Sequence, residues 1–275
     1  MTGDCNTAVR TDDQINNYAW RNPTYGAYDD RELPEVVAPG TSMTTAHYGP
    51  WTGTSMASPV IAATQALVHS RNNTLKYYPE AVKAIIMATA TCNISGSDNP
   101  LLDADADDGA GEVDSYNAHL LAYSGYKVDG GNTPGIRGYD YGYMNFTWPS
   151  QFDSNGWYYE VYKMKTTVYD RKARILLTWA AKPTCDLAGN PPSPAYRNCW
   201  DDLPDADLDI YVWRWDGLNW YYVGGSATYE NNYEMMSFPI NRNDEYWIMI
   251  NRKSYLRNDT RFSLAWWTSQ NVACQ

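Results

Sequence analysis

The chain has 275 residues, and 32 aspartate and glutamate residues outnumber 21 lysine and arginine residues, which gives a net charge of −11. An acidic surface repels phosphate backbones, so this balance argues against nucleic acid as a partner. No apolar run approaches the ~20 residues that a helix needs to span a bilayer, so we expect no membrane span. Hydrophobic residues make up 44% of the chain, which is enough for one large domain or two ordinary domains with packed cores.

The first part of the chain carries signals for two helices. Residues Ala57 to His69 are mostly small and apolar, and we expect Pro59 in the first helical turn, where a missing N–H costs little. A second helix is expected from Pro79 to about Thr89, because apolar residues recur from Val82 at i, i+3 and i+4 spacing.

Glycines and a proline gather between Ser124 and Tyr143, and we interpret this stretch as a linker between two domains, 1–130 and 131–275. Short runs of alternating or apolar residues follow the linker and indicate a β-sandwich or jelly roll. The candidate strands are Trp157–Met164, Ala173–Trp179, Leu208–Trp215, Trp220–Val223, Tyr233–Phe238, Tyr246–Asn251 and Phe262–Trp267.

The most informative stretch is GTSMASP at residues 53–59, which follows PEVVAPG at residues 34–40. A serine at the start of a helix lies where backbone N–H groups and the positive end of the dipole stabilise a developing oxyanion. Ser55 also needs a nearby base before its hydroxyl can attack a carbonyl. Thr54 and Ser55 could instead merely cap the helix, which is the commonest role of such residues.

GTSMASP resembles the active-site signature of the subtilase family of serine proteases, and ELPEVVAPG at residues 32–40 resembles the strand that precedes it. YPEAVKAIIMATA (78–90) and GAGEVD (109–114) resemble the helix and the GxGxVN segment that follow. The resemblance covers residues 10 to 122, with four segments in the expected order. It implies a partial three-layer α/β domain of the subtilisin type, in which Ser55 is the catalytic nucleophile of a serine endopeptidase.

The other catalytic motifs of this family are missing from the sequence. Subtilases carry their triad in the order Asp, His, Ser, but no Asp-Thr-Gly or His-Gly-Thr motif precedes Ser55, and Asn6, Asn16 and Asn17 lack the context of the oxyanion asparagine. After Pro59 the sequence reads VIAA where the family usually reads HVAG, so the helix must pack differently.

Because of these gaps, we expect the isolated chain to be a poor enzyme. It could be a truncated copy of a complete protease, which is the interpretation we favour, one part of a split protease completed by an N-terminal peptidase half, or a pseudo-protease. Met1–Arg10 lacks the pattern of a signal peptide. Since the family is usually exported, we expect an extracellular protein whose signal peptide was lost with the missing N-terminus.

The three histidines are weak candidates for the missing base. The resemblance places His47, the only one before Ser55, in the loop ahead of the nucleophile, so we expect a loop role for it. His69 lies along the predicted helix, ~20 Å from Ser55 at 1.5 Å per residue, and His119 follows the motif. We expect both to be surface or core residues.

The second domain resembles the β-sandwich modules that follow subtilase catalytic domains. The resemblance rests on DADLDIYVW (205–213), ILLTW (175–179), NNYE (231–234) and EYWIMI (245–250). It implies an accessory jelly-roll module for stability, surface attachment or substrate approach. A non-catalytic chain whose sandwich binds a surface, a polysaccharide or a protein partner is therefore the alternative function.

The chemistry needs no cofactor, but a structural calcium ion is conceivable because clustered acidic side chains supply hard oxygen ligands. Asp207 and Asp209 form one candidate, together with Asp201, Asp202 and Asp205, and the acidic loop 103–108 forms another. Our default interpretation of both groups is solvent-exposed acidic residues.

Two further sets of residues have more than one possible role. The aromatic residues of the 213–222 stretch could form a carbohydrate or partner platform, but we interpret them as core; they are Trp213, Trp215, Trp220, Tyr221 and Tyr222. Among the five cysteines, Cys185 and Cys199 flank a loop that a disulfide could close, and the odd count leaves one thiol over. Substrate preference is not predictable from these residues.

Overall fold

The computed structural model describes residues 2–3, 14–15, 34–44, 46, 49–91, 109–124, 135–144, 158–165, 171–180, 184–188, 196–201, 206–228, 231–252 and 260–269. The helices are α1 (Thr54–Arg71), the short 3₁₀ helix η2 (Asn73–Tyr77), α2 (Pro79–Thr89) and α3 (Ser115–Ser124). None of the helices in these residues is long and apolar enough to cross a membrane. The described part of the protein is mostly β-structure, with its few helices in the N-terminal half.

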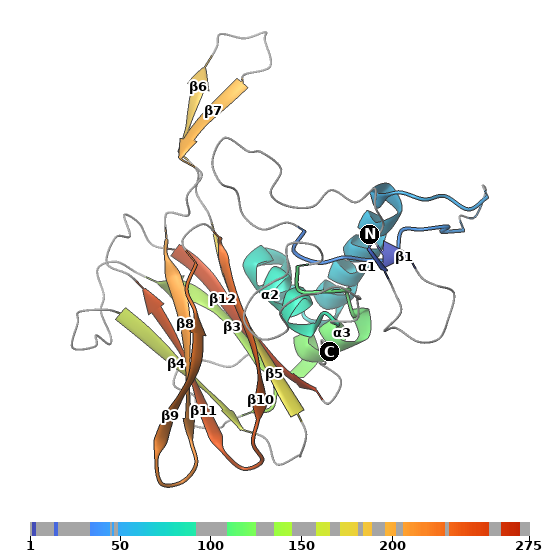
Figure 1. Ribbon diagram of the computed structural model, residues 1–275. Helices are drawn as coiled ribbons and strands as arrows, with labels where there is room; N and C mark the ends of the chain where they lie inside the picture. Colours follow the sequence, from blue (N-terminus) through green and yellow to red (C-terminus); the bar gives the residue numbers. More distant parts are fainter. Residues whose placement is uncertain are drawn as a thin grey trace.

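Two four-stranded antiparallel sheets form the C-terminal half (Figure 1). One has the order β10-β5-β12-β3, and the other has the order β4-β11-β8-β9. Their strands are β3 (Gly138–Met144), β4 (Tyr158–Lys165), β5 (Arg171–Trp179), β8 (Leu208–Trp215), β9 (Trp220–Ser226), β10 (Tyr233–Ile240), β11 (Glu245–Arg252) and β12 (Thr260–Ser269). All seven strands expected from the sequence are present, whereas the finer assignment as a jelly roll stays a prediction.

A core of aliphatic and aromatic side chains lies between the two sheets, because alternate residues of each strand point inward. On β8 the inward residues are Leu208, Ile210 and Val212, and each is fully buried. The same alternation turns the tryptophans of β8 outward. The interpretation of the 213–222 aromatic residues as core is therefore wrong for Trp213, Trp220, Tyr221 and Tyr222, all of which are exposed.

The structure adds elements that the sequence analysis missed. Strand β3 lies inside the stretch interpreted as a linker, where it pairs with β12 at the edge of its sheet. Strands β6 (Thr184–Ala188) and β7 (Tyr196–Asp201) form a separate antiparallel pair, whose register sets residue 185 opposite residue 199. The disulfide between these two positions stays a prediction. Strands β1 (Thr2–Gly3) and β2 (Gln14–Ile15) make a minimal pair near the N-terminus.

The helix that carries Ser55 begins earlier than the sequence suggests. Helix α1 starts at Thr54 rather than Ala57, so Pro59 lies in its second turn and not in its first. Helix α2 has the predicted bounds, and Val82, Ile85 and Ile86 are buried as expected. Helix α3 was not predicted.

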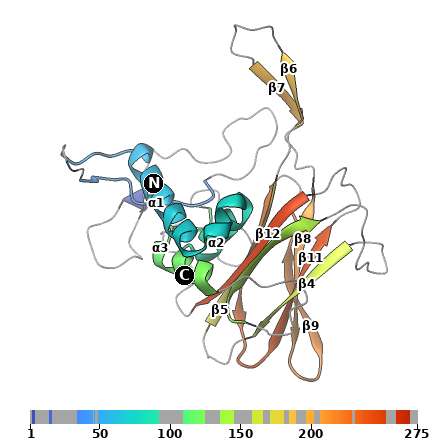
Figure 2. The same ribbon diagram turned by 180° about the vertical axis from the view of Figure 1, so that it is seen from behind.

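The helices pack against one face of the sandwich, as the two opposite views show (Figures 1 and 2). Eight of the 11 residues of α2 are buried. Its side chains share one hydrophobic cluster with Leu176 of β5, Met235 of β10 and Trp267 of β12. The division expected at residue 130 leaves the helices with β1 and β2 on one side and the strands of the two large sheets on the other, and the two sides bury a common core.

A buried arginine fixes this contact. Arg174 of β5 is only 2% exposed, and its Nη1 donates to the backbone carbonyls of Ala90 (2.6 Å) and Ala110 (2.8 Å). The carbonyl of Met87 lies 3.5 Å from the same nitrogen, and Nε donates to the Ser237 hydroxyl at 3.3 Å. Carbonyls at the C-terminus of a helix have no intrahelical donor and attract a cation. Arg174 therefore joins the end of α2 and the 109–113 segment to the sheet.

We expect Arg174→Met to lower the free energy of unfolding by about 3 kcal/mol, because two buried carbonyls lose their donor. Urea denaturation followed by tryptophan fluorescence would measure the change. The control is Arg242→Met, which alters an exposed turn residue between β10 and β11. Equal midpoints for the two variants would contradict this role of Arg174.

A buried carboxyl group on β10 is hydrogen-bonded to the end of β9 and to the residues that follow it. Glu234 of β10 is 1% exposed and accepts hydrogen bonds from the Ser226 hydroxyl, from the Thr228 N–H (2.6 Å) and from the Thr228 hydroxyl (2.7 Å). Burial raises the pKa of Glu234 to about 7 against the lowering effect of these donors, and nearby Asp209 adds to the rise. Asp209 is itself fully buried and accepts from Tyr211, so its expected place on a solvent-exposed strand edge is wrong.

The pKa of Glu234 predicts a pH-dependent stability. The folded protein holds this proton more tightly than the unfolded chain, so stability falls as the pH rises from about 4.5 to about 7. Glu234→Gln mimics the protonated form, and we expect it to flatten this slope and to stabilise the protein at pH 8 by up to about 3 kcal/mol. Urea midpoints at pH 5 and pH 8 would test this, and parallel slopes in both proteins would contradict it.

Candidate active site

The segment that leads to Ser55 runs beside the GAGEVD segment. Val37 donates to the carbonyl of Gly111 at 3.0 Å and accepts from the N–H of Val113 at 2.9 Å, so residues 37 and 112 form a parallel bridge. Ala110 donates to the carbonyl of Glu35 at 2.9 Å. Two segments that the sequence analysis identified separately therefore lie side by side.

Gly109 permits this close approach. Its φ is +63°, and a Cβ atom at this position would lie 2.0 Å from the Pro34 carbonyl oxygen and 2.5 Å from that of Glu35. No other residue type fits such a contact, because the backbone itself would have to move. The glycine that opens GAGEVD is thus required for the path of residues 34–40.

Backbone hydrogen bonds hold the residues before Ser55 close to the end of this segment. Met43 and Trp51 exchange backbone hydrogen bonds of 2.8 and 3.0 Å, and Gly53 donates to the carbonyl of Gly40 at 2.9 Å. The hydroxyl of Thr52 accepts from the N–H of Ser42 at 2.9 Å. These bonds place the start of α1 at the end of the VVAPG segment.

Ser55 is the second residue of α1, and its side chain is exposed. Gly53 caps the helix without a side-chain hydrogen bond, so the capping role considered for the Thr-Ser pair is not observed. Within the described residues, no hydrogen bond engages the Ser55 hydroxyl. The Ser55 hydroxyl is thus exposed and lies at the positive end of an 18-residue helix.

Pro59 modifies the helix backbone at Ser55. In a regular α-helix the N–H of residue 59 would donate to the carbonyl of residue 55, but proline has no N–H and its ring crowds that carbonyl. Pro59 therefore removes the helical bond that would hold the Ser55 carbonyl. The first two turns of α1 depend on the preceding loop and on packing for their position.

Helix α3 packs against α1. The hydroxyls of Thr64 and Ser115 are 2.6 Å apart, and Thr64 is fully buried between the two helices. Asp114 caps α3, because its carboxylate accepts from the backbone and the side-chain amide of Asn117 at 2.9 and 3.0 Å. Asp114, the last residue of GAGEVD, thus has a structural role as the cap of α3. Its carboxylate, three residues before Asn117, is the sequence signal that could have predicted this helix.

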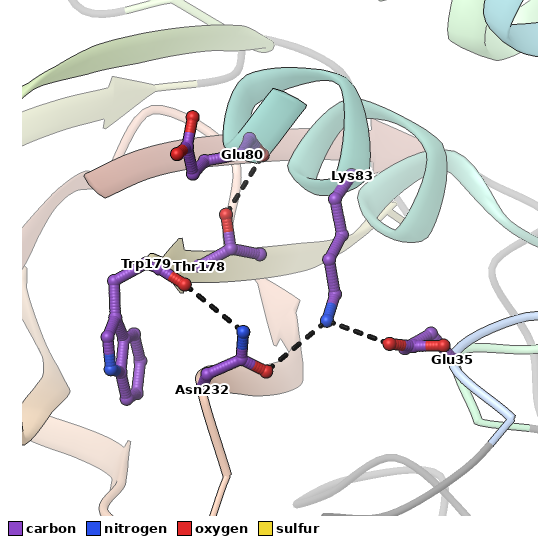
Figure 3. Close-up of polar contacts among 6 residues, drawn as sticks. All are labelled: Glu35, Glu80, Lys83, Thr178, Trp179 and Asn232. Carbon is purple, nitrogen blue, oxygen red and sulfur yellow. Dashed lines mark hydrogen bonds and ion pairs between the residues drawn. The ribbon is translucent and has the colours of Figure 1, made fainter. Parts of the chain in front are cut away.

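A second set of polar contacts joins the 34–40 segment, α2 and the sandwich (Figure 3). Lys83 Nζ donates to Glu35 at 3.0 Å and to the Asn232 side-chain oxygen at 3.4 Å. Asn232 donates in turn to the carbonyl of Trp179 at 3.1 Å, and Thr178 donates to the carbonyl of Glu80 at 2.9 Å. Lys83 and Glu35 are partly exposed, so this ion pair orients the segments more than it stabilises them.

The structure brings no base to Ser55 within its described residues. His47 lies outside these residues, as do Asn6, Asn16 and Asn17. His69 is in the last turn of α1, 14 residues and roughly 20 Å along the helix from Ser55. His119 is on α3 and is partly buried.

The candidate calcium ligands are not assembled in the described part of the chain. Residues 103–108, 202 and 205 lie outside it, and nothing is described of the residue 201 side chain. Among the residues that are described, no group of three or more His, Cys, Asp or Glu side chains is placed to hold a metal ion. A structural calcium ion stays a prediction.

Comparison with known proteins agrees with the geometry of the site. Residues 7–121 match the model of the subtilase family. The match includes Ser55, the segments on both sides of it and most of α3, so this part of the chain is similar to the subtilases. No curated protein matches the chain.

We expect Gly109→Ala to destabilise the protein by roughly 2–4 kcal/mol, because the new methyl group meets backbone carbonyls and the φ angle disfavours alanine. Thermal and urea denaturation would measure the loss. Gly49→Ala is the matched control, since a Cβ there has no heavy atom within 4 Å. A Gly109→Ala protein as stable as the Gly49→Ala control would contradict this account of the segment.

Proposed function

We propose that this chain supplies the nucleophile of a subtilisin-type serine endopeptidase, with Ser55 as the residue that forms the acyl-enzyme. The observation that carries the proposal is the exposed Ser55 hydroxyl at the start of α1, in a segment that matches the subtilase family. The loop 40–53 and the Gly109 contact set the position of this helix start.

The chemistry follows from this position. Ser55 Oγ attacks the carbonyl carbon of the scissile peptide bond, and its proton passes to a histidine that an aspartate orients. The negative charge that develops on the carbonyl oxygen is stabilised by the Ser55 N–H and by the helix dipole. The histidine then protonates the leaving amine, and water later hydrolyses the ester.

The histidine, the aspartate and the oxyanion asparagine must come from outside the described residues. One exposed face of α1 is suited to pack against the polypeptide that carries these residues. Ser55, Pro59, Ala62 and Ala66 follow one another at i, i+4, i+7 and i+11, and all are exposed. We propose that polypeptide carrying the other catalytic residues covers this face of small side chains. It would belong either to this polypeptide or to a complementing peptidase half.

A fluorophosphonate probe, which reacts with activated serines, tests the nucleophile. We expect Ser55→Ala to abolish labelling of the protease in its natural complete form. Ser58→Ala is the matched control, because Ser58 is also exposed and lies one turn along the same helix. Labelling that depends on Ser55 and not on Ser58 would support the proposal, and equal labelling of both variants would refute it.

The alternative function is a non-catalytic chain whose β-sandwich binds a surface, a polysaccharide or a protein. It predicts no labelling of any form, together with binding that survives Ser55→Ala. For either function we propose an extracellular location, because subtilases are typically secreted. A jelly-roll accessory role and a structural calcium ion belong to the same proposal, and a thermal melt with and without chelator would test the ion.

A further inference from the structure

The sheet β4-β11-β8-β9 carries a cluster of large aromatic side chains on its outward face. We call this cluster the aromatic platform; it consists of Trp213, Trp215, Trp220, Tyr222 and Trp247. Trp213, Trp220 and Tyr222 are 37%, 43% and 53% exposed. The helices lie against the other sheet, so the platform faces away from α1, α2 and α3 (Figures 1 and 2). An exposed aromatic surface of this kind marks a binding site more often than it marks chance exposure.

Strand register places the five rings in two adjacent rows. Trp215 is paired with Trp220 on one side, and Trp213 lies between Trp247 and Tyr222 in the next row. Neighbouring strands are about 4.8 Å apart and successive outward residues about 6.8 Å apart. The rings therefore form one continuous surface across β11, β8 and β9.

The rings hold one another in fixed orientations. Ring centroids are 5.2 Å apart for Trp213 and Tyr222, 5.2 Å for Trp215 and Trp220, and 4.6 Å for Trp220 and Trp247. The interplanar angles are 55°, 40° and 67°. Such packing reduces the entropy that a ligand must remove on binding. Because the rings are not coplanar, the surface suits a single flexible chain better than a flat crystalline face.

Polar and cationic groups surround the rings on the β4 side. Lys163 Nζ lies 5.0 Å from the centroid of the Trp247 ring, and the Trp247 indole N–H donates to Glu245 at 2.6 Å. Lys165 is exposed two residues further along β4, on the same face and opposite Glu245. Two ammonium groups and one carboxylate, that of Glu245, thus lie on this side of the rings and leave a local excess of positive charge in a chain with a net charge of −11. This local positive charge would attract an anionic ligand.

We propose that the aromatic platform binds an acidic polysaccharide. The C–H faces of sugar rings are weakly positive and stack on the negative faces of Trp213, Trp220 and Tyr222. Carboxylate or sulfate groups of the polymer pair with Lys163 and Lys165 through charge-assisted hydrogen bonds. Sugar hydroxyls meet the polar edges of the indole and phenol rings.

The character of this surface favours a glycan over an apolar protein partner. The large aliphatic side chains Ile210, Val212, Ile248 and Ile250 of the same strands point into the core, while the exposed rings each carry an N–H or O–H group. The site is separate from Ser55, so this inference does not depend on the proposed function.

The test measures binding of the complete Ser55→Ala chain by affinity electrophoresis in polygalacturonate, chondroitin sulfate and neutral hydroxyethylcellulose. We expect retardation by an acidic polymer and affinity for the neutral polymer at least about tenfold weaker. The uronate and sulfate gels distinguish the two sources of negative charge. Added salt should weaken the acidic interaction, because it screens the lysines.

Variants separate ring stacking from charge. Trp213→Ala combined with Trp220→Ala should weaken binding by about tenfold or more, whereas Trp220→Phe, which keeps a ring, should retain it. Lys163→Gln combined with Lys165→Gln should reduce acidic binding to the neutral level and remove its salt dependence. Tyr116→Ala is the control, because Tyr116 is a 71% exposed ring on α3, away from the platform.

Three results would overturn the proposal. The first is equal mobility of the chain in all three gels and in a gel without polymer. The second is retention by gelatin but not by acidic polymers, which would indicate a protein ligand. The third is binding that survives the double tryptophan variant while circular dichroism shows that variant to be folded.

Discussion

The hydrogen bonds of one buried guanidinium group connect the two halves of this molecule. Arg174 lies on a strand of the sandwich, yet its Nη1 donates to carbonyls at the end of α2 and in the 109–113 segment. That segment bonds to Val37, and Gly40 bonds to Gly53 at the start of α1. Hydrogen bonds from the Arg174 side chain and then between backbone groups thus connect the sandwich to the start of α1. A buried cation is costly unless its donors are used, so Arg174 favours one arrangement of these segments.

This arrangement gives the two sheets different roles. The sheet β10-β5-β12-β3 forms a wall for α2, and its outward residues Leu176, Met235 and Trp267 belong to the core of the N-terminal half. The sheet β4-β11-β8-β9 shields the opposite side of the sandwich core and presents its outward rings to solvent. The sandwich thus packs against the helical segment through one sheet and leaves the outward face of the other sheet exposed to solvent.

Much of the fold was predictable because its strands alternate clearly between apolar and polar positions, and α2 has a regular apolar face. The sequence failed where tertiary contacts decide the conformation. Strand β3 is rich in glycine and tyrosine and forms only because β12 offers an edge. Asp209 seemed suited to a solvent-exposed edge by its charge, but Tyr211 and the covering strands bury it.

The candidate site likewise has parts that a local sequence pattern reveals and parts that only the packed structure reveals. Ser55 was identifiable as the candidate residue from a local motif, because it and its helix are consecutive in sequence. The role of Gly109 depends on the carbonyls of Pro34 and Glu35, about 75 residues earlier in the numbering, and no local pattern reveals such a contact. Arg174 in the ARILLTW run was a visible irregularity, a charge in an apolar strand, but only the packed structure identifies the carbonyls that it binds.

Most of helix α2 is buried, and this affects how the protein unfolds. Its buried side chains share a core with strands that follow it by about 50 to 180 residues in the sequence. Neither half can release the other without exposing this apolar surface, so the described elements should melt in a single cooperative transition. A protease that cut the chain between residues 124 and 135 would therefore leave two pieces that stay associated and migrate as one species in native conditions.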